Sequence, residues 1–589
     1  MCVAAAIALT MTFRCDFQPY IIASGAVRRV GTVMAEGAST ATPVRIAALG
    51  GLGEIGLNLM VIECAGRGVI IDCGVMFPEE PLLGSGVYIP ELSWLGASQL
   101  QFDAIVLTHA HEDQIGALPH LLRRIKAPVY GSGVTLAFVR RRIAEAGFAC
   151  EAELRTMYPR RAFDAGPFNI EPIRVTHSTP DSMAIAIRTP AGIIVHSGDF
   201  KIDDAPVDGQ LFDRERFGEL GREGVALLLS DSTNVERTGR SGSESSLKPV
   251  LREIVSRGRG RFFLSSFSSH LHRIRQVAEV AREFGRRVVP LGRAMAESVR
   301  LGAETGQLAF APGMFIEPGE AEFLEKRRLA YLASGSQGEA LSALARVAAG
   351  THPRVSVEPG DVIVLSSRFI PGNERTIGTL INRLYKSGAE VLYESVAPVH
   401  VSGHACRDEL AEMIALVRPA NFVPIHGEYR HLSRHLALAV EAGIPERNCF
   451  LLEDGDTLIL DSGGAHRGRA VTAGRVVIEG GEPGDPALIG ERRILARDGA
   501  VTVVIVVSAK TGRMIAAPGM VSRGVVSGDG TSDHMRRVGE ELAARLAQFR
   551  GPMGQGGIAL KDEVTRAVRR YFGDELDKRP LVTTLIVEV

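Results

Sequence analysis

Four short apolar segments of this chain end on histidine or aspartate side chains. Short apolar runs bounded by turn residues predict buried strands, and here they alternate with helix-like segments. Such alternation favours a layered α/β fold, in which polar side chains at strand ends meet along one edge. The fold must therefore bring distant parts of the chain to a shared site. The four segments are DAIVLTHAH, IEPIRVTHS, GIIVHSGDF and NFVPIHGEY, which carry His109, His111, His177, Asp199 and His426.

The segment HAHEDQIG is the densest of these strand ends. His109 and His111 are two residues apart, so both imidazoles can project to one side and hold a cation. Asp113 can then reach a neighbouring cation. Neutral imidazole nitrogen with carboxylate oxygen suits zinc, or manganese where oxygen ligands dominate. Candidates for the remaining ligands stand at other strand ends: His177, Asp199, His400, His404 and His426.

The other histidines are expected to have lesser roles. His196 and His272 are interpreted as packing residues or as supports for the ligands. Six more lie in predicted helices or polar loops and are expected at the surface: His120, His352, His431, His435, His466 and His534.

Length and composition restrict the class of protein. A chain of 589 residues exceeds one ordinary core, so several domains are expected. The formal net charge of −1 excludes a general polycation. A local cluster of twelve Lys or Arg and four Glu, between Lys248 and Arg300, is interpreted by itself as a solvated helix face. Seven scattered cysteines without a C-x-x-C pair argue against a thiolate zinc site and fit a cytoplasmic protein. No apolar run is long enough to span a membrane.

Many separate motifs occur in an order that resembles a known family. HAHEDQIG, VTHS, HSGDF and PIHGEY resemble motifs of the metallo-β-lactamase fold. DSTN, FSSHLHRIRQ, LGRAM, SGSQGE, IPGNE and HVSGHA resemble the β-CASP nuclease insertion. With GGLGEIGLN near the start, the chain from Val44 to Val589 resembles the bacterial ribonuclease J family. The resemblance implies an α/β fold: a metallo-β-lactamase αββα sandwich with an inserted β-CASP α/β domain and a small α+β C-terminal domain.

The expected domain boundaries follow from this resemblance and from the strand and helix pattern. Residues 1–43 are expected to be a disordered or artefactual extension, with Met34 as an alternative start. Residues 44–224 form the first part of the metallo-β-lactamase domain, 225–375 the β-CASP domain, 376–480 the second part and a linker, and 481–589 the C-terminal domain. Within the last, one amphipathic helix is predicted from Met535, Val538, Leu542, Leu546 and Phe549, which recur at helical spacing.

The resemblance also implies a role for individual residues. One metal would be held by His109, His111 and His177, with Asp199 bridging to a second metal held by Asp113, His426 and the position of Gln114. Two zinc ions are expected, with Mn²⁺ or Mg²⁺ as alternatives, and a hydroxide between the metals would attack the phosphodiester. His404 would protonate the leaving 3′-oxygen, oriented by Asp231. The substrate contacts implied are His400, Ser402, Gly403, Ser336, Gln337 and Arg273.

The function implied is 5′→3′ exoribonucleolytic decay and maturation of RNA, with some endonucleolytic cleavage. The expected substrate is single-stranded RNA with a 5′-monophosphate, and the arginine-rich segment is expected to guide it through salt-sensitive phosphate contacts. A homodimer or homotetramer and partner proteins of RNA decay are expected, in the cytoplasm. A small-molecule hydrolase is disfavoured because it needs no such insertion, whereas DNA remains an alternative substrate.

One position departs from the pattern of the family at a metal ligand. The family run is H-x-H-x-D-H, and here Gln114 takes the last place, offering only a neutral amide oxygen. Three outcomes are open: a weakly bound second metal, which is preferred; a slower one-metal enzyme; or a catalytically silent RNA-binding subunit of a decay complex. Ala294 replaces a usual serine and is expected to weaken one substrate hydrogen bond, and Gly86 replaces a usual aspartate, for which there is no physical account.

Overall fold

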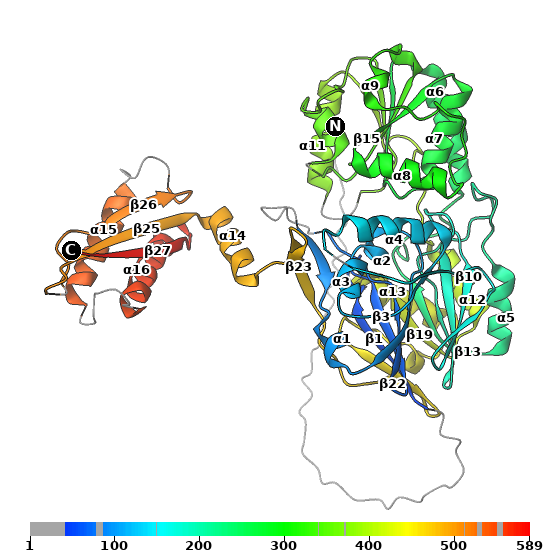
Figure 1. The fold of residues 1–589 in the computed structure, drawn as a ribbon, viewed down its shortest axis with the longest axis horizontal. Helices are drawn as coiled ribbons and strands as arrows, with labels where there is room; N and C mark the ends of the chain where they lie inside the picture. The colour runs from blue at the N-terminus through cyan, green and yellow to red at the C-terminus, as the bar shows by residue number, and fades with distance from the viewer. Residues whose placement is uncertain are drawn as a thin grey trace, which may run out of the picture. The chain divides into compact units, whose positions relative to one another are not determined.

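The computed structural model describes residues 42–77, 86–148, 150–339, 341–369, 373–511, 513–526, 533–549 and 558–589. The extension predicted for the start of the chain lies, apart from its last two residues, outside the described residues. Residues 41–589 form one unit, which contains a two-sheet sandwich, an inserted parallel sheet and a C-terminal α+β domain (Figure 1). The predicted fold is thereby confirmed. Across these ranges no helix combines the length and the apolar character that a membrane crossing requires.

The first sheet of the sandwich has the strand order β22-β21-β1-β3-β4-β6-β7-β8. Its inner residues, such as Ile46, pack against the second sheet, whereas the alternate residues, such as Ala47, pack against helices. This follows from the period of two in side-chain direction along a strand. The bounds are β1 Val44–Gly50, β3 Leu59–Cys64, β4 Arg67–Ile71, β6 Gln101–Val106, β7 Val129–Gly131, β8 Leu154–Thr156, β21 Thr457–Asp461 and β22 Gly464–Arg467. The helices of this half are α1 Ser93–Ala97, α2 Glu112–Ile115, α3 Leu118–Leu122 and α4 Gly133–Glu145.

The second sheet has the order β19-β13-β12-β11-β10-β9. Leu227 and Leu229 face the first sheet, and Leu228 between them packs with the outer helices, so the four layers follow the expected helix–sheet–sheet–helix order. The strands are β9 Phe163–Ala165, β10 Phe168–Arg174, β11 Met183–Thr189, β12 Gly192–His196, β13 Val225–Asp231 and β19 Asn421–Ile425. The helices are α5 Arg214–Glu223, α12 Arg407–Val417 and α13 Tyr429–Glu441. A short pair, β2 Leu52–Gly53 with β20 Gly427–Glu428, lies beside the site.

The insertion is a parallel sheet with the order β15-β16-β14-β17-β18. Every residue of β14 is buried, as expected for a parallel strand covered by helices on both faces. The strands are β14 Phe262–Ser265, β15 Arg287–Leu291, β16 Leu329–Ala333, β17 Val362–Leu365 and β18 Glu390–Leu392. The helices are α6 Leu247–Arg257, α7 Leu271–Glu283, α8 Arg293–Glu304, α9 Pro318–Ala321, α10 Ala343–Ala348 and α11 Glu374–Lys386.

Both predicted boundaries of the insertion are wrong. The strand β13 pairs with β12 and β19 and so belongs to the sandwich, which moves the first boundary beyond residue 225. At the other end, α11 packs with β18, and β18 pairs with β17 of the insertion, so the second boundary lies beyond residue 375. A buried apolar strand has the same sequence pattern whether it pairs in the sandwich or in the inserted sheet. Sequence periodicity therefore does not show which of the two sheets contains it.

The C-terminal domain is a three-stranded sheet with the order β26-β25-β27. The predicted amphipathic helix is confirmed as α15 Asp533–Gln548, with Met535, Val538, Leu542 and Leu546 buried. Its other elements are α14 Pro486–Asp498, β25 Ala500–Val507, β26 Gly519–Arg523, α16 Ile558–Leu576 and β27 Leu581–Glu588. The strand β24 Glu482–Pro483 still pairs with β23 Arg475–Glu479, which pairs with β5 Val87–Pro90, so the domain begins a few residues after the predicted residue 481.

Candidate functional site

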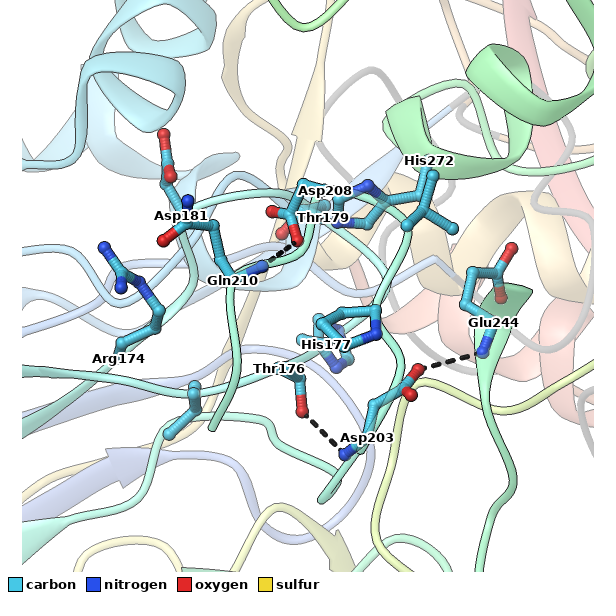
Figure 2. A pocket seen from close by; sticks show the side chains of 13 residues that line it. Arg174, Thr176, His177, Thr179, Asp181, Asp203, Asp208, Gln210, Glu244 and His272 are labelled. Carbon is cyan, nitrogen blue, oxygen red and sulfur yellow. Dashed lines mark hydrogen bonds and ion pairs between the residues drawn. The ribbon is translucent and has the colours of Figure 1, made fainter. Parts of the chain in front are cut away.

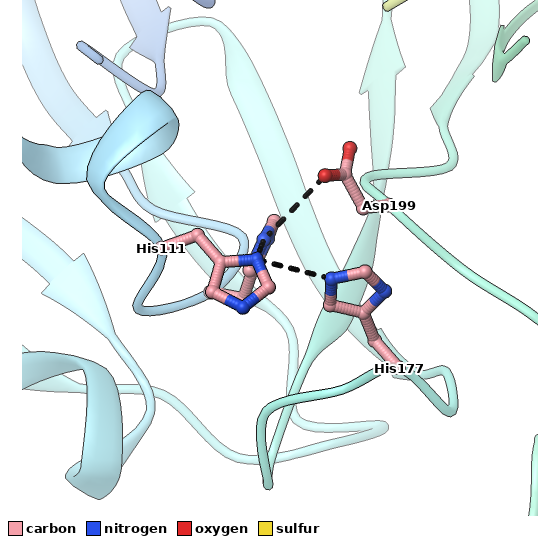
Figure 3. Close-up of side chains that lie close together, drawn as sticks. His111, His177 and Asp199 are labelled. Carbon is pink, nitrogen blue, oxygen red and sulfur yellow. Dashed lines mark hydrogen bonds and ion pairs between the residues drawn. The ribbon is translucent and has the colours of Figure 1, made fainter. Parts of the chain in front are cut away.

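The predicted strand-end residues meet at one edge of the sandwich. His109 follows β6, and His111 has extended backbone angles before α2 begins at Glu112. His109 Nε2 lies 3.0 Å from His111 Nδ1, and His177 Nε2 lies 3.1 Å from the same atom. Asp199 Oδ2 lies 3.6 Å from His109 Nε2. Figure 3 shows the imidazoles and the carboxylate turned toward a common point.

The protonation of this group fits a divalent cation. Burial lowers the pKa of His109 and His177 well below the ordinary value, and it lowers the pKa of His111 to about 4, so all three imidazoles are neutral. Burial, followed by the nearby carboxylates of Asp231 and Asp113, raises the pKa of Asp199 well above its ordinary value. The three imidazoles turn unprotonated nitrogens toward one another beside the Asp199 carboxylate, and none of the three rings carries a positive charge. Three nitrogen ligands with one oxygen ligand form a set that binds zinc.

Hydrogen bonds behind the imidazoles fix which nitrogen faces the centre. His177 Nδ1 lies 2.7 Å from the carbonyl oxygen of Gly403, so it donates its proton there and leaves Nε2 free. His109 Nδ1 lies 3.0 Å from Thr108 Oγ1, which donates to Asp72 Oδ2 at 2.8 Å. Such partners orient metal ligands and raise their basicity. Asp72 and Thr108 were not predicted; a polar pair flanking a ligand strand is the only signal in the sequence.

A second group adjoins the first through Asp199. His426 Nε2 lies 3.4 Å from Asp199 Oδ2 and 3.7 Å from Asp113 Oδ2. His426 Nδ1 lies 2.9 Å from Asn58 Oδ1, so it donates its proton to that amide oxygen and turns Nε2 toward the carboxylates. Burial lowers the pKa of His426, which keeps the imidazole neutral as a ligand requires. His426 has a φ of 53°, a left-handed conformation that costs energy for a non-glycine residue.

Gln114 occupies the space between the two carboxylates of this second group. Its Nε2 donates to Asp113 Oδ2 and to Asp199 Oδ2, both at 3.2 Å. The side chain is buried, and its Oε1 has no hydrogen-bond partner in the described part of the chain. The amide N–H groups thus place a positive dipole between the Asp113 and Asp199 carboxylates. Turning the amide over would point Oε1 at the same place as a neutral oxygen ligand.

His404 and Asp231 form a hydrogen-bonded pair, and with Asp199 and His426 they make a set of side chains close enough to share a cation. His404 Nδ1 lies 2.8 Å from Asp231 Oδ2, and Thr233 donates its backbone N–H and its hydroxyl to Asp231 Oδ1 at 3.0 and 2.7 Å. Burial opposes the charge of Asp231, but the His404 imidazole outweighs it and lowers the pKa of Asp231 to about 2. Burial likewise opposes protonation of His404, but the Asp231 carboxylate raises the net pKa of His404. The pair therefore favours an imidazolium at His404, paired with an ionised Asp231.

The loop that carries His404 is closely fitted to the metal ligands. A Cβ atom on Gly403 would meet His177 Cε1 at 2.8 Å, so only glycine permits this approach. Ser402 Oγ accepts from Asn234 Nδ2 at 2.8 Å and from the His404 backbone N–H at 3.2 Å. His400 is half-buried, and its Nδ1 has no partner among the residues described. Ser402 and Gly403 thus shape the loop that carries His404.

The remaining predicted substrate residues lie in the insertion. Ser336 and Gln337 are buried, and Gln337 Nε2 donates to the carbonyl oxygen of Arg368 at 2.6 Å. Arg273 is fully buried, and its guanidinium donates to Glu244 at 2.6 and 2.8 Å and to the Ser366 carbonyl oxygen at 2.9 Å. The predicted RNA contact of Arg273 is therefore wrong. The sequence showed a basic segment but not the acid that pairs with this arginine.

Other expectations are corrected by burial. Arg261 and Arg286 are also buried, so the arginine-rich segment is partly interior rather than one solvated face. His431 and His435 are buried, not exposed as predicted, because they share the inner face of α13 with Leu432 and Leu438. His435 Nδ1 contacts Ser232 Oγ at 3.0 Å. His196 is buried at the end of β12 and its Nδ1 accepts from the Gly198 backbone N–H, in keeping with a packing role.

A pocket rich in acidic side chains is lined by His177 together with Asp181, Asp203, Asp208 and Glu244 (Figure 2). Its acids are largely engaged by the protein: Asp203 accepts from the Glu244 backbone N–H at 2.9 Å and pairs with Lys201, while His272 lies 3.9 Å from Asp208. The pocket shares His177 with the candidate centre. The chemistry therefore belongs to the strand-end groups rather than to this pocket.

Comparisons with known proteins agree with the geometry of the site. Four family models match successive parts of the chain: Metallo-beta-lactamase superfamily at 53–214, Ribonuclease J, beta-CASP domain at 259–384, Zn-dependent metallo-hydrolase RNA specificity domain at 388–450, and Ribonuclease J C-terminal domain at 487–589. Ribonuclease J of Mycobacterium tuberculosis is 38% identical over 560 residues, covering 94% of this chain and 99% of that protein. Ribonuclease J 1 of Streptococcus pyogenes is 35% identical over 550 residues, covering 92% of this chain and 97% of that protein.

Among solved structures, a protein of unknown function from Enterococcus faecalis aligns with a TM-score of 0.50 at 15% identity. The alignment covers 71% of this chain and 100% of that protein. At this identity the likeness concerns the fold alone.

Proposed function

The chain belongs to the ribonuclease J family and is a metal-dependent ribonuclease, and from that premise we propose that it degrades RNA from the 5′ end with His404 as general acid. The substrate proposed is single-stranded RNA with a 5′-monophosphate, with some internal cleavage. The observation that carries the proposal is the 2.8 Å contact between His404 Nδ1 and Asp231 Oδ2 beside the cluster of His109, His111 and His177. An imidazole held in its protonated form next to a metal centre suits the protonation of a leaving alkoxide.

The proposed ligand roles follow the two groups. His109, His111, His177 and Asp199 would hold one divalent ion, which we propose is zinc, and Asp113, Asp199, Gln114 and His426 would hold a second. A bound divalent ion supplies charge for the phosphate oxygens and a water molecule of lowered pKa at neutral pH. Thr108, Asn58 and the Gly403 carbonyl hold the imidazoles in the orientation that leaves the facing nitrogens unprotonated.

The proton balance of the hydrolysis assigns the role of His404. Water gives up one proton to the solvent as its oxygen bonds to phosphorus, the bond from phosphorus to the 3′-oxygen breaks, and the leaving oxygen takes up a proton. His404 donates that proton, and Asp231 stabilises the imidazolium beforehand through its charge and hydrogen bond. Thr233 keeps Asp231 turned toward His404 by occupying its second oxygen.

We further propose that the second metal binds more weakly than the first. Three imidazoles serve the first group, whereas the second has one imidazole, two carboxylates and a neutral amide. A neutral amide oxygen is a poorer zinc ligand than an imidazole nitrogen. The Gln114 amide must also give up its hydrogen bonds to Asp113 and Asp199 before a cation enters. The catalytically silent RNA-binding subunit is the second candidate, and this position of Gln114 is the observation that favours it.

An end-labelled RNA assay tests the proposal. Metal-loaded protein is incubated with the same oligonucleotide carrying a 5′-monophosphate or a 5′-hydroxyl, and His404→Ala serves as the matched variant. The proposal predicts release of 5′-mononucleotides, faster with the monophosphate, and loss of turnover in the variant with unchanged metal content. Absence of turnover with intact RNA binding would favour the silent subunit instead.

Location and assembly are proposed on less direct grounds. The described cysteines form no disulfide bonds: Cys64, Cys73, Cys150, Cys406 and Cys449. Free thiols are typical of a reducing compartment, so we propose that the protein is located in the cytoplasm. We also propose homodimers or homotetramers, and RNA-decay proteins as partners. Size-exclusion chromatography with light scattering on the full chain distinguishes these assemblies from a monomer.

A further inference from the structure

Arg368 joins the insertion to the loop of the proposed general acid. It follows β17, and its Nη1 donates to Asn234 Oδ1 at 2.5 Å. Asn234 lies three residues after β13 and also contacts the His404 loop. Its Nδ2 donates to Ser402 Oγ at 2.8 Å and to the His404 carbonyl oxygen at 2.9 Å. One amide therefore separates the Arg368 guanidinium from the backbone of His404.

The rest of this guanidinium is not satisfied by the protein. Arg368 Nε and Nη2 are buried, and neither has a hydrogen-bond partner within the described ranges. A guanidinium stays charged in proteins and carries five N–H donors, so unmet donors cost free energy that a ligand can recover. The side chain as a whole is 28% exposed, although Nε and Nη2 are themselves buried, so the arginine lies at the edge of the insertion with two donors turned inward.

Nearby charges leave this spot positive. Glu394 Oε1 lies 4.0 Å from Arg368 Nε, beyond hydrogen-bond distance, and 3.3 Å from Arg237 Nη1. Two guanidinium groups thus face one carboxylate beside the His404 loop. Arg273, the arginine that the sequence favoured for RNA contact, differs because Glu244 fully engages it.

We propose that Arg368 binds a phosphate group of the RNA next to the scissile one, with Asn234 holding the guanidinium in place. Arginine suits this role because its planar fork donates two parallel hydrogen bonds to phosphate oxygens. The inference rests on the proposed function, because His404 locates the scissile phosphate. The phosphate bound by Arg368 is either the terminal 5′-phosphate or an internal phosphodiester, and both offer the same anionic oxygens.

The test compares Arg368→Gln, Arg368→Lys and the control Arg354→Gln in the metal-loaded full chain. Arg354 is an exposed arginine of the insertion that pairs with Glu322, so its loss changes net charge equally. We expect Arg368→Gln to raise KM about tenfold, because one charge-assisted contact is lost. The dependence of log(kcat/KM) on log salt should weaken by about one phosphate contact. Arg368→Lys should recover part of the affinity, and Arg354→Gln should match the wild type.

Two forms of RNA separate the sources of the phosphate. An effect confined to 5′-monophosphorylated RNA identifies the terminal phosphate, and an equal effect on 5′-hydroxyl RNA identifies an internal one. The proposal is overturned if KM and salt dependence are unchanged while kcat falls or its pH profile moves, since Arg368 would then act only on the His404 loop. If the wild type binds RNA without cleaving it, the proposed function fails. The RNA dissociation constants and their salt dependence then test Arg368 independently.

Discussion

The two halves of the metal centre share Asp199 but are built differently. The first half has three imidazoles, of which His109 and His177 are buried, and their Nε2 atoms lie 3.0 and 3.1 Å from His111 Nδ1. Each ring has a hydrogen-bonding partner on its other nitrogen. The second half has one imidazole, and Gln114 fills the space between its carboxylates with amide donors. The difference teaches that two adjoining groups on one sheet edge can offer unequal ligand sets, which is the basis on which we propose a weaker second metal.

Removing an imidazole from the first half should have the largest effect. His111→Ala deletes the ring whose Nδ1 contacts both His109 and His177, so the first metal and nearly all turnover should be lost. Metal content by mass spectrometry and cleavage of 5′-monophosphorylated RNA measure both. His466→Ala, an exposed histidine of β22, is the control. Turnover near the wild-type rate in His111→Ala would show that the first half is not the catalytic one.

Removing the acid should leave both halves loaded but slow the reaction. His404→Ala should lower kcat by about a hundredfold or more, because general acid catalysis commonly contributes that much. Asp231 raises the pKa of His404, so the acid form persists to higher pH, and kcat should decline as pH rises through that pKa. Asp231→Asn should therefore move this decline to lower pH. An unmoved profile with full metal content would remove His404 from the role of acid.

Loosening the support of the second half should have the smallest effect. Asn58→Ala removes the oxygen that orients His426 and the amide that donates to the Asp113 carbonyl oxygen at 2.8 Å. The affinity for the second metal should fall about tenfold while the first metal is retained, since the loss of such support typically costs at least that much. Calorimetric metal titration resolves the two sites. Equal weakening of both would indicate general destabilisation instead.

The site was largely predictable from sequence because its ligands stand at strand ends. Each of His109, His177, Asp199 and His426 lies one to three residues after a strand, so the edge of the sheets brings the segments that carry them together. The pair of His404 and Asp231 came from motif resemblance, and the structure places them in contact. The sequence showed that Gln114 departs from the family run H-x-H-x-D-H, but it did not predict the hydrogen bonds of Gln114 to Asp113 and Asp199.

The failed predictions share one physical cause. Arg273 and His435 were judged by their own polarity, whereas their location depends on partners distant in sequence, Glu244 and Ser232. The predicted boundary at residue 225 is wrong for a related reason. The sheet that contains β13 is determined by its pairing with β19, which lies nearly two hundred residues later in the sequence. Arg368 went unnoticed because a single arginine after a strand carries no periodic signal. Local pattern predicts the period of apolar residues, whereas tertiary pairing decides where a polar side chain is buried.

Metal stoichiometry and affinity test the inequality of the two halves most directly, when the wild type is compared with Gln114→His. The account predicts one tightly bound zinc per wild-type chain and a second bound at least about tenfold more weakly. In Gln114→His an imidazole replaces the amide, so two zinc ions of similar affinity and a higher rate of RNA cleavage are expected. Two equally tight metals in the wild type, unchanged by the substitution, would contradict the account.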